Sequence, residues 1–191
     1  VEELLDFSRM QNGLTLKPEL LDLAAEVEEA VLLSGQRAAE LGVALVYSAP
    51  ELPVPVMADK NRVRQVMVNV LDNAIKYSFT GGQIDVDIHE APGEVQVAVV
   101  DDGQGISPED LENVRVKFYK GRGAVRGSGI GLAVVDEIIA AHGGKMEIES
   151  ELNRGTTVTL CWPLYQKTIE NGQTKDSEEN GNDKAGKANE R

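Results

Sequence analysis

The sequence predicts an α+β fold, a two-layer sandwich in which a mixed β-sheet carries three helices on one face. Stretches with apolar residues at helical spacing alternate with short stretches in which every second residue is apolar. Their order is helix, strand, helix, strand, helix, two strands, helix, two strands. The chain has 191 residues, of which 41% are hydrophobic, so it can bury one good core.

The chain opens on a stretch with apolar positions at helical spacing. Residues 1–12 carry this pattern, and Gly13 suits the position that follows a helix end. We therefore expect residues 1–13 to be the end of a helix whose start is missing. Because the chain begins at Val1 without an initiator methionine, we expect it to be a fragment of a longer protein.

A short strand and a second helix are predicted next. Leu14 and Leu16 alternate as a strand that Pro18 interrupts. Asp22 can cap a helix whose apolar positions keep a spacing of three to four residues, and Gly42 ends it.

The middle of the chain predicts a strand, a loop and a long helix. Residues 43–48 form the strand, and Asp59 can cap the helix at residues 60–77, which has one apolar face. Between them lies a cluster of three prolines that predicts a loop: Pro50, Pro53 and Pro55.

The remaining strands come in pairs around one more helix. Alternation from Ile84 to His89 and again from Val95 to Val99 predicts a hairpin with one buried face. After an irregular stretch we expect a helix and two further strands, at residues 129–142, 145–150 and 156–162. No apolar pattern recurs in residues 166–191, so a disordered polar tail is predicted there.

Composition excludes several classes of function. A formal net charge of −13 disfavours a nucleic-acid or anionic-membrane surface, which requires a basic face. Cys161 is the only cysteine, so disulfide frameworks and cysteine-based zinc sites are excluded. No run of eighteen apolar residues and no signal peptide is present, so no membrane span or export is expected. The two histidines, His89 and His142, are interpreted as structural.

Three polar residues share one stripe of the helix at 60–77. Asn69, Asn73 and Lys76 stand at i, i+4 and i+7, beside the apolar face. Amide oxygens suit hard cations such as Mg²⁺, and a nearby lysine suits a phosphate. The alternative is an ordinary solvated helix face.

A carboxylate ends one predicted strand. Asp101 has the same parity as Val95, Val97 and Val99, so its side chain should emerge on the buried face, where it needs a donor partner. The exocyclic amine of a base would serve, and Gly103 and Gly105 would let a flat ligand approach the backbone. The alternative is an aspartate that caps a turn.

The most informative segment is a glycine run that opens the last predicted helix. Residues 127–132 place glycines at alternate positions before an apolar helical stretch, which presents backbone N–H groups to an anion such as a polyphosphate. Residues 113–126 contain five basic and no acidic residues, so they predict a mobile lid over an anion, or else an ordinary flexible loop.

Together these motifs resemble the catalytic ATP-binding domain of sensor histidine kinases, a branch of the Bergerat-fold ATPases. The resemblance covers residues 1–163. Five segments resemble, in order, the N box, the first glycine box, the phenylalanine box, the second glycine box and the terminal Gly-Thr element of that family: residues 69–77, 101–105, 117–120, 127–132 and 154–157.

The resemblance implies roles for individual residues. Asp101 would bond the adenine amino group, Asn73 would ligate Mg²⁺, and Asn69 and Lys76 would act in catalysis. Residues 106–126 would form a lid over the nucleotide. The residues implied in ATP binding are Asn69, Asn73, Lys76, Tyr77, Asp101, Gly103, Gly105, Ile106, Lys120, Gly127, Ser128, Gly129, Ile130, Gly131, Leu132 and Thr156.

The resemblance also implies the chain's place in a larger protein. Residues 1–13 would end the dimerisation and phosphoacceptor helix, 14–165 would be the catalytic domain, and 166–191 the tail. The phosphoacceptor histidine is absent, so this fragment should bind ATP without labelling itself. We expect a cytoplasmic domain of a homodimeric parent, anchored in the membrane or not, with a phosphoacceptor domain and a response regulator receiver domain as partners and no nucleic acid.

Two other functions share these features. One is a serine kinase of the anti-sigma type, which has the same ATP site and would produce acid-stable phosphoserine. The other is a nucleotide-responsive binding module without catalysis, in which closure of the lid changes a partner surface. Asn69 stands where the hydrolytic relatives carry a glutamate general base, which argues against a dedicated ATPase.

Overall fold

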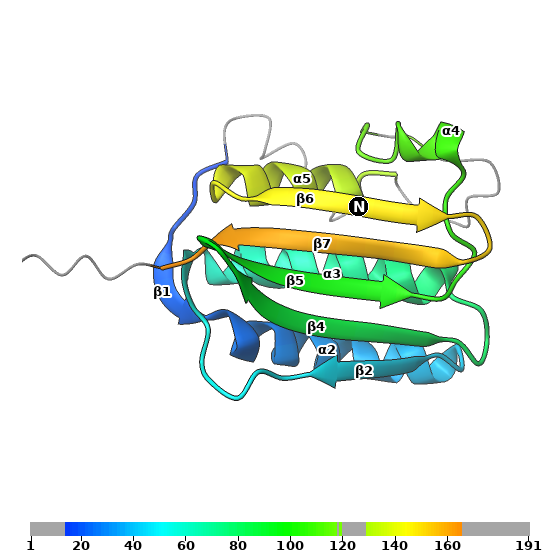
Figure 1. Cartoon of the computed structure of the whole chain (residues 1–191), viewed down its shortest axis with the longest axis horizontal. Coiled ribbons are helices and arrows are strands. Elements are labelled where there is room, and N and C mark those ends of the chain that lie inside the picture. Colours follow the sequence, from blue (N-terminus) through cyan, green and yellow to red (C-terminus); the bar gives the residue numbers. More distant parts are fainter. Residues whose placement is uncertain (1–13, 118, 120–128, 166–191) are drawn as a thin grey trace, which may run out of the picture.

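The computed structural model describes residues 14–117, 119 and 129–165. A five-stranded sheet dominates it (Figure 1). Only the β2–β4 pair is parallel among the described strands, so the sheet is mixed, as predicted. Its strands, in spatial order, are β2 (Ala44–Ser48), β4 (Gln83–Ala91), β5 (Glu94–Asp101), β7 (Gly155–Pro163) and β6 (Lys145–Glu151).

Three helices cover one face of this sheet, which confirms the two-layer sandwich (Figure 1). They are α2 (Leu23–Glu40), α3 (Lys60–Tyr77) and α5 (Gly131–Ala141). Their apolar stripes meet the inward side chains of the strands in one core, in which Met67, Ile84 and Leu160 are fully buried. Burial of this apolar surface is the main force that holds the two layers together.

The predicted caps of the first two helices are confirmed. The Asp22 carboxylate accepts from the N–H of Ala24 at 3.1 Å, and Asp59 accepts from Asn61 and Arg62 at 3.0 and 3.2 Å. These bonds satisfy N–H groups that the first helical turn leaves without an intrahelical partner. The predicted start of α3 therefore agrees with the structure.

The N-terminal strand was placed wrongly by the sequence pattern. Residues 14–17 carry no strand; instead β1 (Glu19–Asp22) pairs antiparallel with β3 (Pro55–Ala58). Pro55 therefore belongs to a strand and not to the predicted loop. A proline is tolerated there because it is the first residue of its strand, a position that does not need a backbone N–H donor.

A one-turn helix, α4 (Pro108–Leu111), was also missed. The Ser107 hydroxyl accepts from the N–H of Asp110 at 3.2 Å, and Pro108 occupies the first helical position. Serine followed by proline and two acidic residues is a helix-start signal that the sequence does carry. The helix predicted for residues 1–12 and the tail predicted for residues 166–191 lie outside the described residues. Among the helices that are described, none combines the length and the apolar composition of a membrane span.

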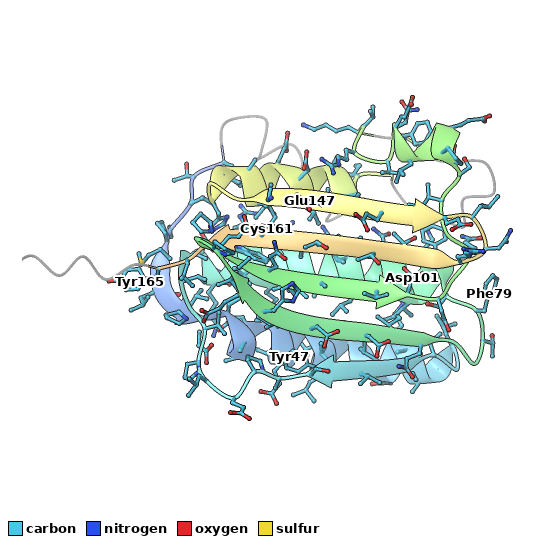
Figure 2. All side chains as sticks on the ribbon, viewed as in Figure 1. Tyr47, Phe79, Asp101, Glu147, Cys161 and Tyr165 are labelled. Carbon is cyan, nitrogen blue, oxygen red and sulfur yellow. The ribbon has the colours of Figure 1, made fainter. Side chains whose placement is uncertain are left out.

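The open face of the sheet is polar, and Cys161 lies on it. Asp85, Asp87 and His89 alternate there with the core residues of β4, as the hairpin pattern predicted. Cys161, labelled in Figure 2, is nevertheless only 1% exposed, and the Glu94 and Lys145 side chains lie near its thiol. Desolvation and the nearby Glu94 charge raise the pKa of the thiol to about 11, so it is protonated at neutral pH.

His142 joins the end of α5 to the start of α3. Its Nδ1 lies 2.7 Å from the Ile138 carbonyl oxygen, and the backbone N–H of Asp59 donates to its Nε2 at 3.0 Å. The Nε2 atom therefore accepts from one backbone group, and the Nδ1 atom donates to the other. His142 is thus structural, as predicted, and its hydrogen-bond partner Asp59 lies 83 residues away in sequence.

We expect His142→Ala to destabilise the fold by about 1–2 kcal/mol, because the part-buried N–H of Asp59 loses its acceptor and the Ile138 carbonyl oxygen keeps only the backbone N–H of residue 142. Urea unfolding measures the change. His89→Ala is the matched control: His89 is exposed and bonds the Gln96 side chain on the open face, so a change below about 0.5 kcal/mol is expected. Equal losses in the two variants would contradict the role assigned to His142.

Candidate nucleotide-binding site

The site begins where β5 ends (Figure 2). Asp101 is the last residue of β5 and follows Val95, Val97 and Val99 on the inward face, as its parity predicted. It is only 8% exposed, and its Oδ1 accepts from the N–H of Gly103 at 2.9 Å. A buried carboxylate with capacity for further hydrogen bonds therefore faces the helical layer.

Burial raises the pKa of the Asp101 carboxyl, because a carboxylate loses hydration there. The backbone N–H groups of Gly103 and Thr156 lower the pKa, and the charge of Asp102 raises it, with a net upward shift. The native state therefore holds an Asp101 proton more tightly than the unfolded chain does. A ligand that donates hydrogen bonds to this carboxylate would oppose the shift.

The two glycines after Asp101 are needed by the protein itself, and their predicted role in the approach of a ligand stays a prediction. A β-carbon at Gly103 would lie 2.3 Å from the Tyr77 carbonyl oxygen, and one at Gly105 would lie 2.0 Å from that of Glu151. Both positions therefore need glycine because protein backbone fills the space, whether or not a ligand is bound. Gly105 also has a φ of +63°, which favours glycine.

The polar stripe of α3 meets the start of α5. Asn69 Nδ2 lies 3.5 Å from the Gly131 carbonyl oxygen, and a β-carbon at Gly131 would lie 3.7 Å from Asn73 Nδ2. One turn on, Lys76 Nζ donates to the Tyr77 hydroxyl at 2.9 Å. The three side chains of this stripe and that of Tyr77 are half-buried. The structure thus brings the N-box segment and the second glycine box together.

The N-terminus of α5 has no side-chain cap among the described residues. Gly129 turns the chain with a φ of +73°, Ile130 is buried, and the helix runs from Gly131 through Leu132. The predicted start at residue 129 was two residues early. Backbone N–H groups in the first turn of a helix, with the positive end of its dipole, form a site for an anion.

Part of the predicted lid lies in the described residues. Ile106 is half-buried, and its backbone N–H donates to Ser150 Oγ at 2.8 Å. The short helix α4 follows it. Arg115 lies 3.8 Å from Asp136, and Lys117 pairs with Glu137, both on α5. Two of the five cations in the basic stretch therefore already pair with carboxylates. Lys120, Gly127 and Ser128 lie outside the described residues.

Thr156 and Ser150 complete this end of the sheet. Thr156 is the strand partner of Asp101 on one side and of Ser150 on the other. Ser150 has no place in the motifs and was missed by sequence reasoning. Its only sequence signal is a hydroxyl on the inward parity of a strand, alongside Met146 and Ile148.

A shallow hollow also lies beside Asp101 and Thr156. Its other lining residues include Val100, Glu149 and Glu151, which belong to the open face of the sheet or its edge. Glu149 and Glu151 disfavour a triphosphate there, and the lining cation Arg154 already pairs with Glu151 at 3.1 Å. We therefore place the candidate site on the helix-facing side of Asp101, between α3 and the start of α5.

The fold and this cluster define an ATP-binding α+β domain, and comparison with known proteins gives its family. The family model of the histidine kinase-, DNA gyrase B- and HSP90-like ATPases matches residues 58–166. The chain belongs to this family.

Relatives within the family are sensor kinases. The chain is 34% identical over 168 residues to histidine protein kinase DivJ of Caulobacter vibrioides and to sensor protein SrrB of Staphylococcus aureus. These matches cover 86% and 85% of the chain but only 28% and 29% of the relatives. Full-length ShkA, solved in complex with AMPPNP, is 25% identical with a TM-score of 0.77, over 87% of this chain and 35% of ShkA.

Proposed function

We propose that the chain is the catalytic domain of a sensor histidine kinase, which transfers the γ-phosphoryl group of ATP to a histidine on a dimerisation domain. One observation carries the proposal: the amides of α3 lie against the N-terminus of α5, at the end of the sheet where Asp101 is buried. A donor-bearing base and an anionic phosphate chain would meet complementary groups there.

Each group of residues has a proposed task. The Asp101 carboxylate accepts from the adenine amino group, and the N-terminus of α5 holds the phosphates. Asn73 offers an amide oxygen to Mg²⁺, which takes its other ligands from phosphate and water, as this ion usually does. Lys76 and Tyr77, joined by their hydrogen bond, support the phosphates near Asn69. Positioning and charge neutralisation then supply most of the catalysis.

The residue types favour a histidine as acceptor over water. Asn69 Nδ2 lies 3.5 Å from the Gly131 carbonyl oxygen at the start of α5, and an amide cannot take a proton from water. Imidazole is already a nucleophile near neutral pH and needs no strong base. Relatives such as DivJ carry the name histidine kinase, so a serine kinase or a non-catalytic module is not favoured.

The test uses a longer protein that contains this chain together with its phosphoacceptor domain. It is incubated with Mg²⁺ and γ-labelled ATP, and the stability of protein-bound label is measured in acid and in alkali. We expect acid-labile, alkali-stable label on histidine. Acid-stable label would support the serine kinase, and no label despite ATP binding would support the binding module. We further propose a cytoplasmic, homodimeric parent that passes the phosphoryl group to a receiver domain.

The proposed metal ligand makes a prediction for Asn73→Ala. In the unaltered chain we expect Mg²⁺ to raise ATP affinity about tenfold or more, because it neutralises phosphate charge near the amide. Asn73→Ala should lose most of that gain while its affinity in EDTA stays within about twofold. Isothermal titration with and without EDTA measures both. Asn61→Ala, an exposed residue at the other end of α3, is the matched control and should keep the full gain.

The raised pKa of Asp101 predicts that fold stability and ATP affinity change in opposite directions with pH. Stability contributed by this carboxyl is fully present at acid pH and is lost as the pH rises through its raised pKa. ATP binding needs the carboxylate, so affinity should fall as the pH drops through the same value. The titration of ATP itself affects both proteins equally, so it cancels in the ratio of wild-type to Asp101→Asn affinity. That ratio should decline at a pH above the ordinary value of 3.8, and a flat ratio down to that pH would contradict the assignment.

A further inference from the structure

Three polar side chains form a row across neighbouring strands at the end of the sheet. Ser150 on β6 is the register partner of Thr156 on β7, and Thr156 is the partner of Asp101 on β5. Register partners in antiparallel strands project from the same face of a sheet. All three side chains therefore lie on the helix-facing side, where Asp101 is buried and the proposed nucleotide binds.

The contacts of Ser150 settle which hydroxyl donates. Ser150 Oγ lies 2.8 Å from the Gly155 carbonyl oxygen and 2.9 Å from Thr156 Oγ1, and it accepts from the Ile106 N–H at 2.8 Å. A carbonyl oxygen can only accept, so the single hydroxyl proton of Ser150 must point to Gly155. The bond to Thr156 then needs the proton of Thr156.

This assignment leaves Thr156 with no proton for a ligand. Its hydroxyl oxygen can only accept, and the carboxylate of Asp101 on the adjacent strand can only accept as well. The row thus presents two acceptors side by side. An amino group, which carries two N–H donors, matches such a pair, whereas a carbonyl oxygen at the same place would meet two acceptors and no donor.

We propose that Ser150 is a positioning and specificity-determining residue: it holds the Thr156 hydroxyl as an acceptor and so selects a 6-amino over a 6-oxo purine. This inference rests on the proposed function, because it concerns the same ATP site. Ser150 acts through Thr156 and touches no nucleotide itself. Its bond to Ile106 additionally fixes the backbone where the predicted lid begins.

The test compares ATP with inosine triphosphate, which has an oxo group where ATP has the amino group. In Ser150→Ala the Thr156 hydroxyl loses its acceptor and becomes free to donate to an oxo group. We expect the ratio of ATP to inosine triphosphate affinity to fall about fivefold or more. Because both ligands are titrated into the same sample, a loss of folded protein cancels in this ratio.

Further variants separate this role from a structural one. Ser150→Thr keeps a hydroxyl in a strand position that tolerates β-branching, so it should restore the ratio. Thr156→Val removes the hydroxyl that Ser150 orients, so adding Ser150→Ala to it should change the ratio no further. An unchanged ratio in Ser150→Ala, or fully additive changes in the double variant, would overturn the proposal.

The same titrations keep the two proposals apart. If the unaltered chain binds ATP and loses affinity on Asp101→Asn, the proposed site stands, and an unchanged ratio in Ser150→Ala then refutes only the role of Ser150. If the unaltered chain binds neither nucleotide, the proposed function fails and the role of Ser150 fails with it.

Discussion

Replacing Asp101 with asparagine is expected to weaken ATP binding about 10–100-fold. A hydrogen bond to a charged group contributes about 1.5–3 kcal/mol, and an amide nitrogen facing the adenine amino group would place donor against donor. The carboxylate is 8% exposed, so water cannot replace the lost interaction freely. Isothermal titration of the 191-residue chain with ATP measures the change directly.

Asp102→Asn is the matched control for this variant. It removes the same charge one residue along the chain, from an exposed side chain whose Oδ1 accepts from the Gln83 N–H at 3.0 Å. We expect its ATP affinity to stay within about threefold of the unaltered chain, because exposed charges interact weakly through water. If the two variants lose affinity equally, Asp101 does not bind the base and the loss reflects net charge alone.

Gly155→Ala is expected to destabilise the fold by more than about 3 kcal/mol, a loss large enough to unfold many domains of this size. A β-carbon there would lie 1.9 Å from the Asp101 carbonyl oxygen and 2.9 Å from the Asp102 Cα, so backbone would have to move. The residue also has a φ of +107°, which side-chain-bearing residues rarely adopt. Urea unfolding followed by circular dichroism measures the effect.

Gly93→Ala separates the cost of the steric clash from the cost of the backbone conformation. Gly93 lies in the turn between β4 and β5 with a φ of +81°, and nothing lies within 4 Å of a β-carbon built there. This variant bears only the cost of the backbone conformation, about 1–2 kcal/mol. If Gly155→Ala costs no more than Gly93→Ala, the close approach of β7 to the end of β5 is not a constraint on the fold.

Most of the elements could be predicted because each follows from a local pattern. The helix at 60–77 agrees with α3 residue for residue, since its cap and its apolar face both lie within the segment. The hairpin of β4 and β5 follows in the same way from strict alternation. The strand placed at Leu14 and Leu16 was wrong because strand formation needs a partner, and only residues 19–22 meet β3.

The candidate site, too, could be predicted only where its features follow from a local pattern. The motifs named Asp101, Asn69, Asn73 and the glycine runs, because their residue types and spacing are visible in the sequence. They did not reveal that Gly103 and Gly105 make room for protein backbone, or that Arg115 and Lys117 already pair with carboxylates of α5. Each of those facts depends on a neighbour from another element.

The sequence by itself determined the fold class, the helix caps, the buried parity of Asp101 and the family to which the site belongs. Each of these is encoded in side-chain periodicity or in a short motif. The tertiary structure alone decided the hydrogen bond of His142, which depends on Asp59, and the orientation of the Thr156 hydroxyl, which depends on Ser150 and Gly155. A hydrogen bond fixes a proton only when both partners are in place, and folding brings those partners together from distant parts of the chain.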